Sequence, residues 1–391
     1  MIRVGFLINP NSDNRLGLFN FLINLLKCLS LVKNKKIKPV LILSKNSNNF
    51  SLSKFKKLGI CIIKSDFFLK EYLLKRIFNK ALIFFFGKSY IYEKLFKKLN
   101  INILSHTQLA LGNKSSIKSF PWFGDFQYYH FPENFSFKNI ILKKINIIFC
   151  TKHSTKIILS SNDSRNDLKK ISIKAYKKSI VNQFPFSLIS KNKILSSKRI
   201  KKKYNIKNNF FYLPNQYFVH KNHIVVLKAL RIILDTKNNE KITIVSTGLN
   251  NDHRNNEYYE SIKTFIKNNN LGSNYLYLGI VPYDDVQSMI YHSVALINPS
   301  QFEGWSSTVE QAKSMGKKII LSNIKVHKEQ KPKRAQYFNK DDFLHLSKIL
   351  EKTWHSYNKK FELEIVKKNF NLTKGKLIKY ALDYQKIILN S

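Results

Sequence analysis

The sequence predicts an α/β protein with two doubly wound, Rossmann-like domains. The chain has 391 residues, which exceeds one typical domain, and 43% of them are hydrophobic, enough for two ordinary cores. Each half contains a series in which short apolar runs alternate with helical segments, a pattern typical of parallel sheets covered by helices. A basic stretch with few large apolar residues, 191–208, separates the two series.

The first series opens with a β-α-β unit of the kind that begins a doubly wound sheet. The apolar run 3–8 ends at the turn signal Asn9-Pro10-Asn11 and predicts a first buried strand. Residues 17–31 have helical periodicity, and 40–43 predict a second strand. The sequence continues with strand-like runs at 59–63, 81–86 and 101–104, two further apolar pieces at 145–150 and 156–160, and a helical segment at 163–171.

The second series begins at 210–213 and alternates in the same way. Its predicted strands and helices are 222–235 (helix), 241–246 (strand), 256–268 (helix), 275–278 (strand), 284–292 (helix), 293–297 (strand) and 317–321 (strand), and two helical segments, 341–357 and 362–390, end the chain. We therefore predict a first domain at 1–190, a basic linker at 191–208 and a second domain at 209–365. A C-terminal helix, 366–391, is expected to pack back toward the first domain.

The strongest candidate site lies between Ile297 and Gln330. An apolar run ends here at the turn signal Asn298-Pro299-Ser300. Glu303 and Gly304 follow in the loop, where glycine lacks the Cβ that would block the close approach of a ligand. A carboxylate in such a loop suits the hydroxyl groups of a sugar.

A helix is predicted directly after this loop. Ser306, Ser307 and Thr308 are residue types that favour a helix N-cap, 309–315 reads as the helix, and Gly316 is suited to its C-terminal cap. The free backbone N–H groups at such a helix start bind anions, phosphate among them. Phosphate and sugar chemistry in one segment predict a nucleotide-sugar site.

The formal net charge of +44 is extreme, and lysine supplies nearly all of it, because only eight of the 68 basic residues are arginine. A coding bias toward Lys, Asn, Ile and Phe is one explanation. Attraction to an anionic membrane leaflet is a second. Specific nucleic-acid binding is disfavoured, because the sequence contains few arginines and no recognisable nucleic-acid module.

The three cysteines, Cys28, Cys61 and Cys150, lie far apart and lack the spacing of metal ligands, which predicts a reducing cytoplasm. The sequence has no signal-peptide architecture and no apolar stretch of the roughly 18 residues that a membrane span needs. We expect a cytoplasmic protein that is soluble or lies on the inner face of the cytoplasmic membrane.

The segment between Ile297 and Gln330 resembles the signature of retaining glycosyltransferases of family four. The matching residues of its "Pro-Ser-x-Phe-Glu-Gly" motif are Pro299, Ser300, Phe302, Glu303 and Gly304. The Gly-Trp-Ser form and the tail with Ser322, Ile324, Val326, His327, Glu329 and Gln330 look like a subgroup associated with bacterial surface polysaccharides. Further similar segments are 122–127 with Pro132-Glu133, Asn215-Gln216 with 220–223, and Leu278-Gly279 with Pro282.

The resemblance implies a GT-B fold, in which two Rossmann-like domains face a central cleft and the donor is bound mainly by the second domain. It implies that Glu303 holds hydroxyl groups of the transferred sugar. The family's second acidic residue, which grips the nucleotide ribose, falls on Gln311, a neutral departure, and Glu310 stands directly before it. We favour Gln311 for this role and retain Glu310 as the alternative.

Lys221 matches the family's phosphate-binding lysine, so the resemblance assigns it to the donor diphosphate. Five residues earlier the family usually has arginine, whereas this chain has Gln216. Arg254 is a candidate to compensate for that lost charge. Donor binding is further assigned to Gly304 and the hydroxyl-rich helix start, Ser306, Ser307 and Thr308.

In the first domain the resemblance points to the segment 125–130. His130, Asp125 and Gln127 are candidates for a place near the transferred sugar and the acceptor, although a lone histidine among aromatic residues is often just part of a core. Gly17 is a candidate for the acceptor-side loop that follows the first strand.

The resulting hypothesis is a retaining glycosyltransferase that needs no metal and no cofactor beyond its nucleotide-sugar co-substrate. We find no convincing Asp-x-Asp site, and Asp284-Asp285 reads as a solvated helix cap. The resemblance implies transfer to a glycan or lipid-linked acceptor in bacterial surface polysaccharide synthesis (lipopolysaccharide, O-antigen or capsule), by front-face attack. The alternative, suggested by Gln216 and Gln311, is a weak or inactive GT-B-like nucleotide-binding protein.

Overall fold

A computed structural model describes the chain over residues 1–8, 16–45, 55–65, 71–186, 190–236, 241–250, 252, 255 and 257–391. The side chains of 16–19, 71–76 and 371 lie outside this description. The chain divides into two units, the first formed by Met1–Phe184 with Gly375–Ser391 and the second by Pro185–Lys374. The sequence prediction had placed these divisions at 190/191 and 365/366.

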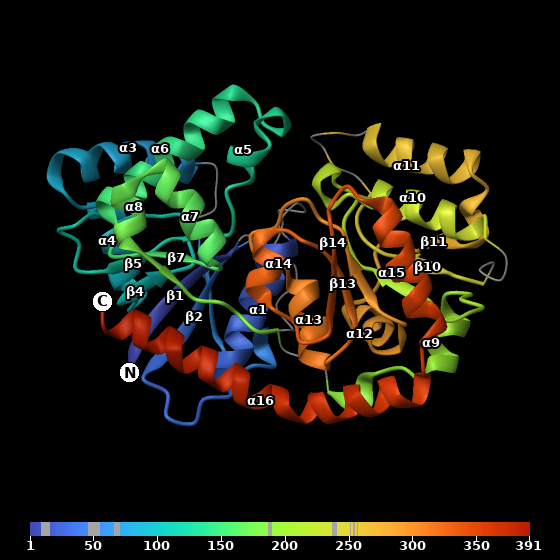
Figure 1. Cartoon of the computed structure of the whole chain (residues 1–391). Helices are drawn as coiled ribbons and strands as arrows, with labels where there is room; N and C mark the ends of the chain where they lie inside the picture. Colours follow the sequence, from blue (N-terminus) through green and yellow to red (C-terminus); the bar gives the residue numbers. More distant parts are fainter. Residues whose placement is uncertain are drawn as a thin grey trace. The chain divides into compact units, whose positions relative to one another are not determined.

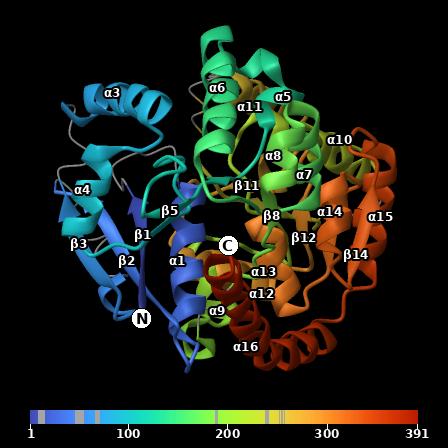
Figure 2. The same cartoon turned by 90° about the vertical axis from the view of Figure 1, so that its left-hand side faces the viewer.

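The first unit contains a parallel sheet in the order β3-β2-β1-β4-β5. Its strands are β1 (Ile2–Ile8), β2 (Ile37–Ser44), β3 (Cys61–Ser65), β4 (Ile103–Ser105) and β5 (Lys118–Phe120). The strands run beside one another in Figure 2, with α4 (Tyr90–Lys98) on one side and α1 (Leu16–Ser30) on the other. Tyr92 and Phe96 of α4 pack on Val40 and Ile42 of β2.

A second parallel sheet of the first unit has the order β6-β7-β8, with β6 at Trp122–Phe123, β7 at Ile157–Leu159 and β8 at Ser179–Val181. Pro121 lies between β5 of the first sheet and β6 of the second sheet, and the segment 155–158 forms hydrogen bonds on both sides of it. The Thr155 N–H donates to the Ser119 carbonyl, and the Ile158 N–H donates to the Pro121 carbonyl. The run from β5 to β6 therefore links both sheets.

The other helices of the first unit are α3 (Glu71–Phe86), α5 (Gln127–His130), α6 (Phe137–His153), α7 (Asn162–Ile171) and α8 (Ile173–Lys178). The predicted strand at 81–86 is wrong, because these residues are the last turns of α3, and the apolar piece at 145–150 lies inside α6. A short apolar run has no periodicity that separates a strand from a helix.

The second unit contains a six-stranded parallel sheet in the order β11-β10-β9-β12-β13-β14, the strand order of a Rossmann fold. Its strands are β9 (Phe211–Leu213), β10 (Ile244–Ser246), β11 (Tyr275–Tyr277), β12 (Leu296–Asn298), β13 (Ile319–Ser322) and β14 (Ala335–Phe338). Its helices are α9 (Ser197–Lys203), α10 (His223–Leu234), α11 (Glu257–Asn268), α12 (Tyr283–His292), α13 (Ser307–Met315), α14 (Lys325–Gln330) and α15 (Phe343–His355) (Figure 1). The sequence analysis missed α9, α14 and β14.

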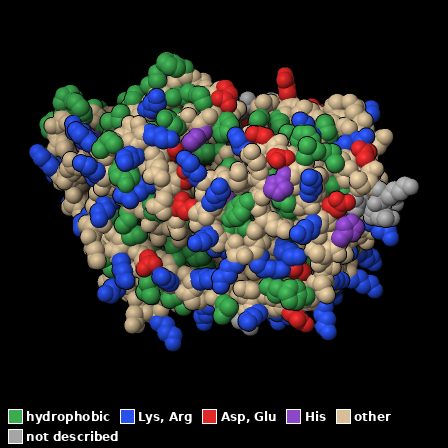
Figure 3. Space-filling model, viewed as in Figure 1, with side chains coloured by type: hydrophobic (Ala, Val, Ile, Leu, Met, Phe, Trp, Pro, Cys, Tyr) green, Lys and Arg blue, Asp and Glu red, His purple; other side chains and the backbone are tan. Residues whose placement is uncertain are grey.

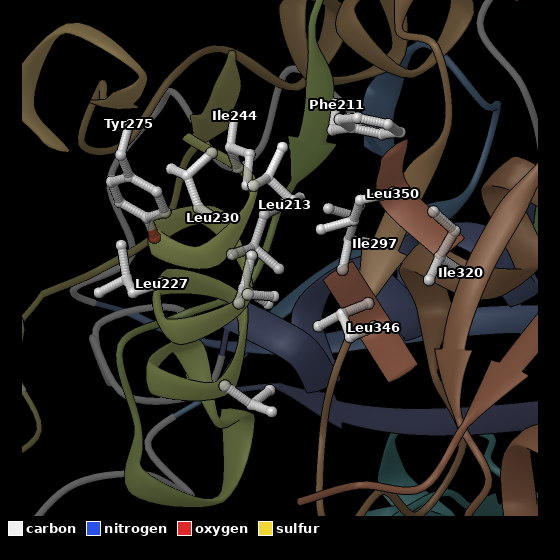
Figure 4. Packing of buried hydrophobic residues seen from close by; sticks show 14 of the residues in the cluster. Phe211, Leu213, Leu227, Leu230, Ile244, Tyr275, Ile297, Ile320, Leu346 and Leu350 are labelled. Carbon is white, nitrogen blue, oxygen red and sulfur yellow. The ribbon is translucent and has the colours of Figure 1, made fainter. Parts of the chain in front are cut away.

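Helices cover both faces of this sheet. Successive residues of a strand point to opposite faces, so each face carries apolar side chains that pack against helices. Phe211 and Leu213 of β9 pack with Leu227 and Leu230 of α10 in one core cluster (Figure 4). Tyr212, between them in sequence, belongs to a second cluster with residues of α12 and α13. The second unit is thus doubly wound, as predicted.

The predicted basic linker, 191–208, lies inside the second unit. Ile200 of α9 is fully buried and joins the cluster on the α12 and α13 face. Lysines dominate this segment, yet a single buried apolar residue, Ile200, anchors the short helix α9.

The last helix, α16, runs from Lys359 to Leu389, and its residues are shared between the two units. Within the second unit, Glu362 pairs with Arg334, at 2.6 and 2.8 Å. Within the first unit, the Tyr384 ring lies 5.5 Å from the His106 ring, and the Gln385 side chain accepts a hydrogen bond from the Lys36 N–H.

Candidate functional site

The candidate site of the second unit lies at the ends of two neighbouring strands, β9 and β12. The connections that leave β9 and β12 diverge here, because β10 and β11 continue the sheet on one side and β13 and β14 on the other. Ligands of open α/β sheets bind at such a switch point. The Asn215 amide, after β9, donates to Asn298 at the end of β12 over 3.2 Å, and so ties the two loops together.

Glu303 and Lys221 form an ion pair at this edge of the sheet. The Lys221 Nζ lies 2.7 Å from Glu303 Oε1, and the side chains are only 16% and 10% exposed. The Ser300 hydroxyl donates to the same carboxylate oxygen over 2.8 Å. Two residues that the sequence analysis assigned to sugar and phosphate, 82 positions apart, are thus in direct contact.

The electrostatic environment keeps Glu303 ionised. Burial alone would raise its pKa, but the Lys221 ammonium, the neighbouring His327 and the hydrogen bonds from Lys221 and Ser300 outweigh burial and lower the pKa to about 2. The carboxylate is therefore a permanent hydrogen-bond acceptor at neutral pH, as a group that binds sugar hydroxyls must be.

We expect this pair to give the protein a specific sensitivity to acid. Because the pKa of Glu303 is lower in the folded chain, ionisation contributes stability on the order of 3 kcal/mol above pH 4.5, lost as the pH falls toward 2. The thermal unfolding midpoint of the protein should fall more steeply below pH 4.5 than that of a Glu303→Gln variant, which cannot take up this proton. Parallel pH profiles would contradict the pKa shift.

His327, at the start of α14, is fully buried beside this carboxylate. Its Nδ1 lies 3.0 Å from the Ser322 carbonyl, and burial lowers its pKa to about 4, so the ring is neutral at pH 7. Within the described part of the chain its Nε2 has no hydrogen-bond partner. The sequence analysis included His327 only as part of a motif tail and assigned it no role.

Helix α13 begins at Ser307, within the hydroxyl-rich segment where the sequence predicted a helix start. Ser306 is the N-cap, but its side chain makes no capping hydrogen bond. Its hydroxyl instead accepts from the Asn298 amide at 2.9 Å and lies 3.2 Å from the Thr308 hydroxyl. The first-turn N–H groups near Ser307 are therefore left without a side-chain cap.

The structure distinguishes Glu310 from Gln311. The buried Glu310 carboxylate accepts from the Gln330 amide and pairs with Lys313, each at 3.1 Å. Gln330 also donates to the Ser306 carbonyl over 2.9 Å, so it fixes the helix start to Glu310. Gln311 is 4% exposed, and its Oε1 is buried without a hydrogen-bond partner among the described residues. Of the two, Glu310 is engaged within the protein.

Gln216 lies beside a tightly packed glycine. Gly248 has φ +148°, and a Cβ there would stand 2.4 Å from the Asn215 carbonyl oxygen and 2.9 Å from the Gln216 Cα. Only glycine lets these two loops approach so closely. Arg254, the candidate to compensate for Gln216, lies outside the described residues.

Gly248→Ala is therefore expected to destabilise the protein by about 2–4 kcal/mol, because the new methyl group meets backbone atoms at a strained φ. The measurement is the thermal unfolding midpoint. The matched control is Gly272→Ala, whose Cβ would meet no atom within 4 Å. Equal midpoints for the two variants would show that the close contact does not constrain the loop after β9.

The first-unit candidates make local contacts. His130 Nε2 lies 2.7 Å from Asp167 Oδ2, and the His130 side chain is 34% exposed. Asp125 is exposed and accepts from the Gln127 N–H over 3.1 Å, while Gln127 itself is buried. Asp167, which the sequence analysis did not single out, is thus the partner of His130.

Gly17 is the second residue of α1 rather than a loop residue, and its structural surroundings lie outside the description. Most of the predicted acceptor-side loop, residues 9–15, lies outside the described residues. The placement of Gly17 in the helix follows from the helical periodicity that begins at this position.

Asp285 differs from the prediction of a solvated cap. It is 4% exposed, and its carboxylate lies 2.5 Å from both the Lys203 Nζ and the Tyr204 hydroxyl.

Among the described residues, no three His, Cys, Asp or Glu side chains are grouped so that they could hold a metal ion. In the same part of the chain, every helix is too short or too polar to cross a membrane.

Part of the chain resembles a known glycosyltransferase family. Residues 194–333 match the family model "Glycosyl transferases group 1". This segment contains Lys221, Glu303 and the whole of α13. No curated protein sequence matches the chain.

Solved structures resemble the chain over its full length. HepE from Anabaena, in complex with UDP-glucose, shares 12% of residues at a TM-score of 0.72, with 100% of both chains covered. A glycosyltransferase from Rickettsia africae shares 14% at a TM-score of 0.65, covering 100% of this chain and 99% of that one. WaaG, a glycosyltransferase involved in lipopolysaccharide biosynthesis, shares 10% at a TM-score of 0.65, covering 99% and 100%. The chain therefore has the GT-B fold of these proteins, and within its second unit residues 194–333 match the glycosyl transferases group 1 model.

Proposed function

We propose that the protein is a retaining, metal-independent glycosyltransferase that moves a sugar from a nucleotide-sugar donor to a glycan or lipid-linked acceptor in bacterial surface polysaccharide synthesis. The observation that carries the proposal is the buried Glu303–Lys221 pair beside the uncapped start of α13. The pair offers one carboxylate for hydroxyl groups and one ammonium for phosphate. Both lie next to backbone N–H groups suited to an anion.

In the proposed reaction, the donor diphosphate displaces Glu303 from the Lys221 ammonium. The freed carboxylate then accepts hydrogen bonds from the sugar hydroxyls. As the bond to the sugar breaks, Lys221 and the N–H groups of α13 stabilise the negative charge on the leaving nucleoside diphosphate. The leaving phosphate takes the acceptor's proton, so the acceptor attacks from the same face and the configuration is retained.

Two similarities support the donor and acceptor classes. HepE was crystallised with UDP-glucose, which supports a nucleotide-sugar donor. WaaG takes part in lipopolysaccharide biosynthesis, which supports a surface-polysaccharide acceptor. We propose a cytoplasmic location at the membrane, where such acceptors are built.

The second candidate function is a GT-B-like protein that binds nucleotides with little or no transfer. The observations that favour it are the neutral side chains at two donor positions, Gln216 and Gln311. A neutral amide forms weaker hydrogen bonds to phosphate and ribose than a charged group does.

A donor panel tests the proposal. The thermal unfolding midpoint of the protein is measured with each of a set of UDP-, GDP-, dTDP- and CMP-sugars. The release of free nucleotide from each donor is then assayed with and without EDTA. A ligand at about 100 times its Kd stabilises the folded protein by about 2.7 kcal/mol. We expect one donor to stabilise the protein and to be consumed in the presence of EDTA. Stabilisation without consumption favours the second candidate, and loss of turnover in EDTA contradicts metal independence.

A further inference from the structure

Two helices of the first unit, α3 and α6, expose large apolar side chains to solvent. On α3, Phe84 and Phe85 are 62% and 76% exposed, and on α6, Ile145 and Ile148 are 51% and 58% exposed. In the face shown in Figure 3, apolar side chains gather over these helices, with Lys and Arg side chains among them. We call this area, defined by Phe84, Phe85, Ile141, Ile145 and Ile148, the α3–α6 surface.

The apolar residues of α6 form two separate faces. Ile147 and Cys150 point into the core of the first unit. Ile141, Ile145 and Ile148 follow one another at intervals of four and three residues, which places them on one exposed stripe. The outer face of an ordinary surface helix is polar. The exposed stripe does not contribute to the core of the first unit, and an exposed apolar patch of this kind is typical of a binding surface.

Lysine side chains connect the two helices. The Lys152 Nζ of α6 lies 5.2 Å from the centre of the Phe84 ring, and the Lys80 Nζ of α3 lies 5.5 Å from the centre of the Phe149 ring. The two helices thus present their exposed apolar residues as one surface, with ammonium groups inside it.

The charge of this surface selects its partner. Helix α6 contains four exposed lysines and no acidic residue: Lys138, Lys143, Lys144 and Lys152. A second copy of the chain, with the same net charge of +44, would bring lysines against lysines. An anionic bilayer instead offers an apolar layer for Phe and Ile side chains and negative headgroups for lysines, whose flexible stems reach outward from an apolar surface.

We propose that the α3–α6 surface binds an anionic lipid bilayer. Phe84, Phe85, Ile145 and Ile148 enter the boundary between headgroups and acyl chains, and the lysines contact the headgroups. Each basic residue near an anionic surface strengthens binding roughly fivefold. This proposal does not depend on the transfer chemistry, and it would hold the protein beside a membrane-linked acceptor.

Vesicle sedimentation with the full-length protein tests the proposal. The probes are vesicles of phosphatidylcholine alone and of phosphatidylcholine with phosphatidylglycerol. We expect binding to the anionic vesicles and about tenfold or more weaker binding to the neutral ones. Combining Phe84→Gln, Phe85→Gln, Ile145→Gln and Ile148→Gln should weaken binding to anionic vesicles about tenfold or more and remove the part that survives high salt.

Matched substitutions separate this surface from the general charge of the chain. Lys138→Gln, Lys144→Gln and Lys152→Gln together should weaken anionic binding strongly, whereas Lys198→Gln, Lys202→Gln and Lys207→Gln should weaken it less. The apolar control is Phe361→Gln with Leu372→Gln, which replaces two exposed residues of α16 and should leave binding unchanged.

Three outcomes would overturn the proposal. The first is no binding to anionic vesicles, and the second is equal binding by the wild-type protein and the apolar quadruple variant, each with a normal unfolding midpoint. The third is a wild-type dimer that the quadruple variant converts to a monomer while vesicle binding stays the same. That last result would assign the surface to contact between copies of the chain.

Discussion

Replacing Glu303 by glutamine is expected to lower kcat/KM for sugar transfer by about 10²–10³-fold, the size of effect seen when one fixed electrostatic contact to a transition state is removed. Glutamine has nearly the same volume but no charge, so its hydrogen bonds to sugar hydroxyls are weaker. The measurement is the initial rate of transfer, with the concentration of folded protein fixed by circular dichroism.

The control for this substitution is Glu362→Gln. Glu362 is also a buried carboxylate of the second unit and pairs with Arg334, but it belongs to α16 and not to the Glu303–Lys221 site. Its replacement should lower the unfolding midpoint without lowering the rate per folded molecule. If Glu303→Gln and Glu362→Gln reduce transfer equally, Glu303 acts only through stability.

Lys221→Met is expected to lower kcat/KM by a similar 10²–10³-fold and, in addition, to destabilise the fold by about 3–5 kcal/mol, because it leaves the buried Glu303 carboxylate without its counter-ion. The loss of activity follows from the unneutralised diphosphate of the leaving group. Unfolding midpoints and transfer rates are measured on the same preparations.

A second substitution separates the two effects of Lys221. The double variant Lys221→Met with Glu303→Gln has no uncompensated charge, so it should recover much of the lost stability, while its rate of transfer should be no higher than that of Lys221→Met. Lys203→Met is the control, because Lys203 also pairs with a buried carboxylate, Asp285, in the same unit. A double variant as unstable as Lys221→Met alone would contradict the view that the two charges stabilise each other.

The sequence predicted the doubly wound fold because its strands are nearly continuous apolar runs that end at turn residues. This held for β1, β9 and β12, whose ends carry Asn-Pro or Pro-Asn turn pairs. It failed at 81–86, where an equally apolar run is the end of α3. The exposed phenylalanines of that run show why: their apolar character belongs to a surface, and not to a buried strand.

The candidate site was predictable in composition but not in its contacts. The family resemblance pointed to Glu303 and Lys221 separately, but only the fold brings the loops after β9 and β12 together and makes the two residues an ion pair. The different surroundings of Glu310 and Gln311 likewise depend on Gln330, a residue of α14 that the sequence analysis did not place in a helix. Contacts between distant segments need the sheet order, which periodicity does not give.

The most direct test of the central claim is transfer of labelled sugar from a nucleotide-sugar panel to bacterial membrane extracts that contain lipid-linked glycans. The wild-type protein and Glu303→Gln are assayed side by side in the presence of EDTA. We predict that one donor labels the glycan or lipid fraction with the wild-type protein, and that Glu303→Gln gives at least 10²-fold less label. Equal labelling by the two proteins, or a donor that binds the wild type without any transfer, would contradict the claim.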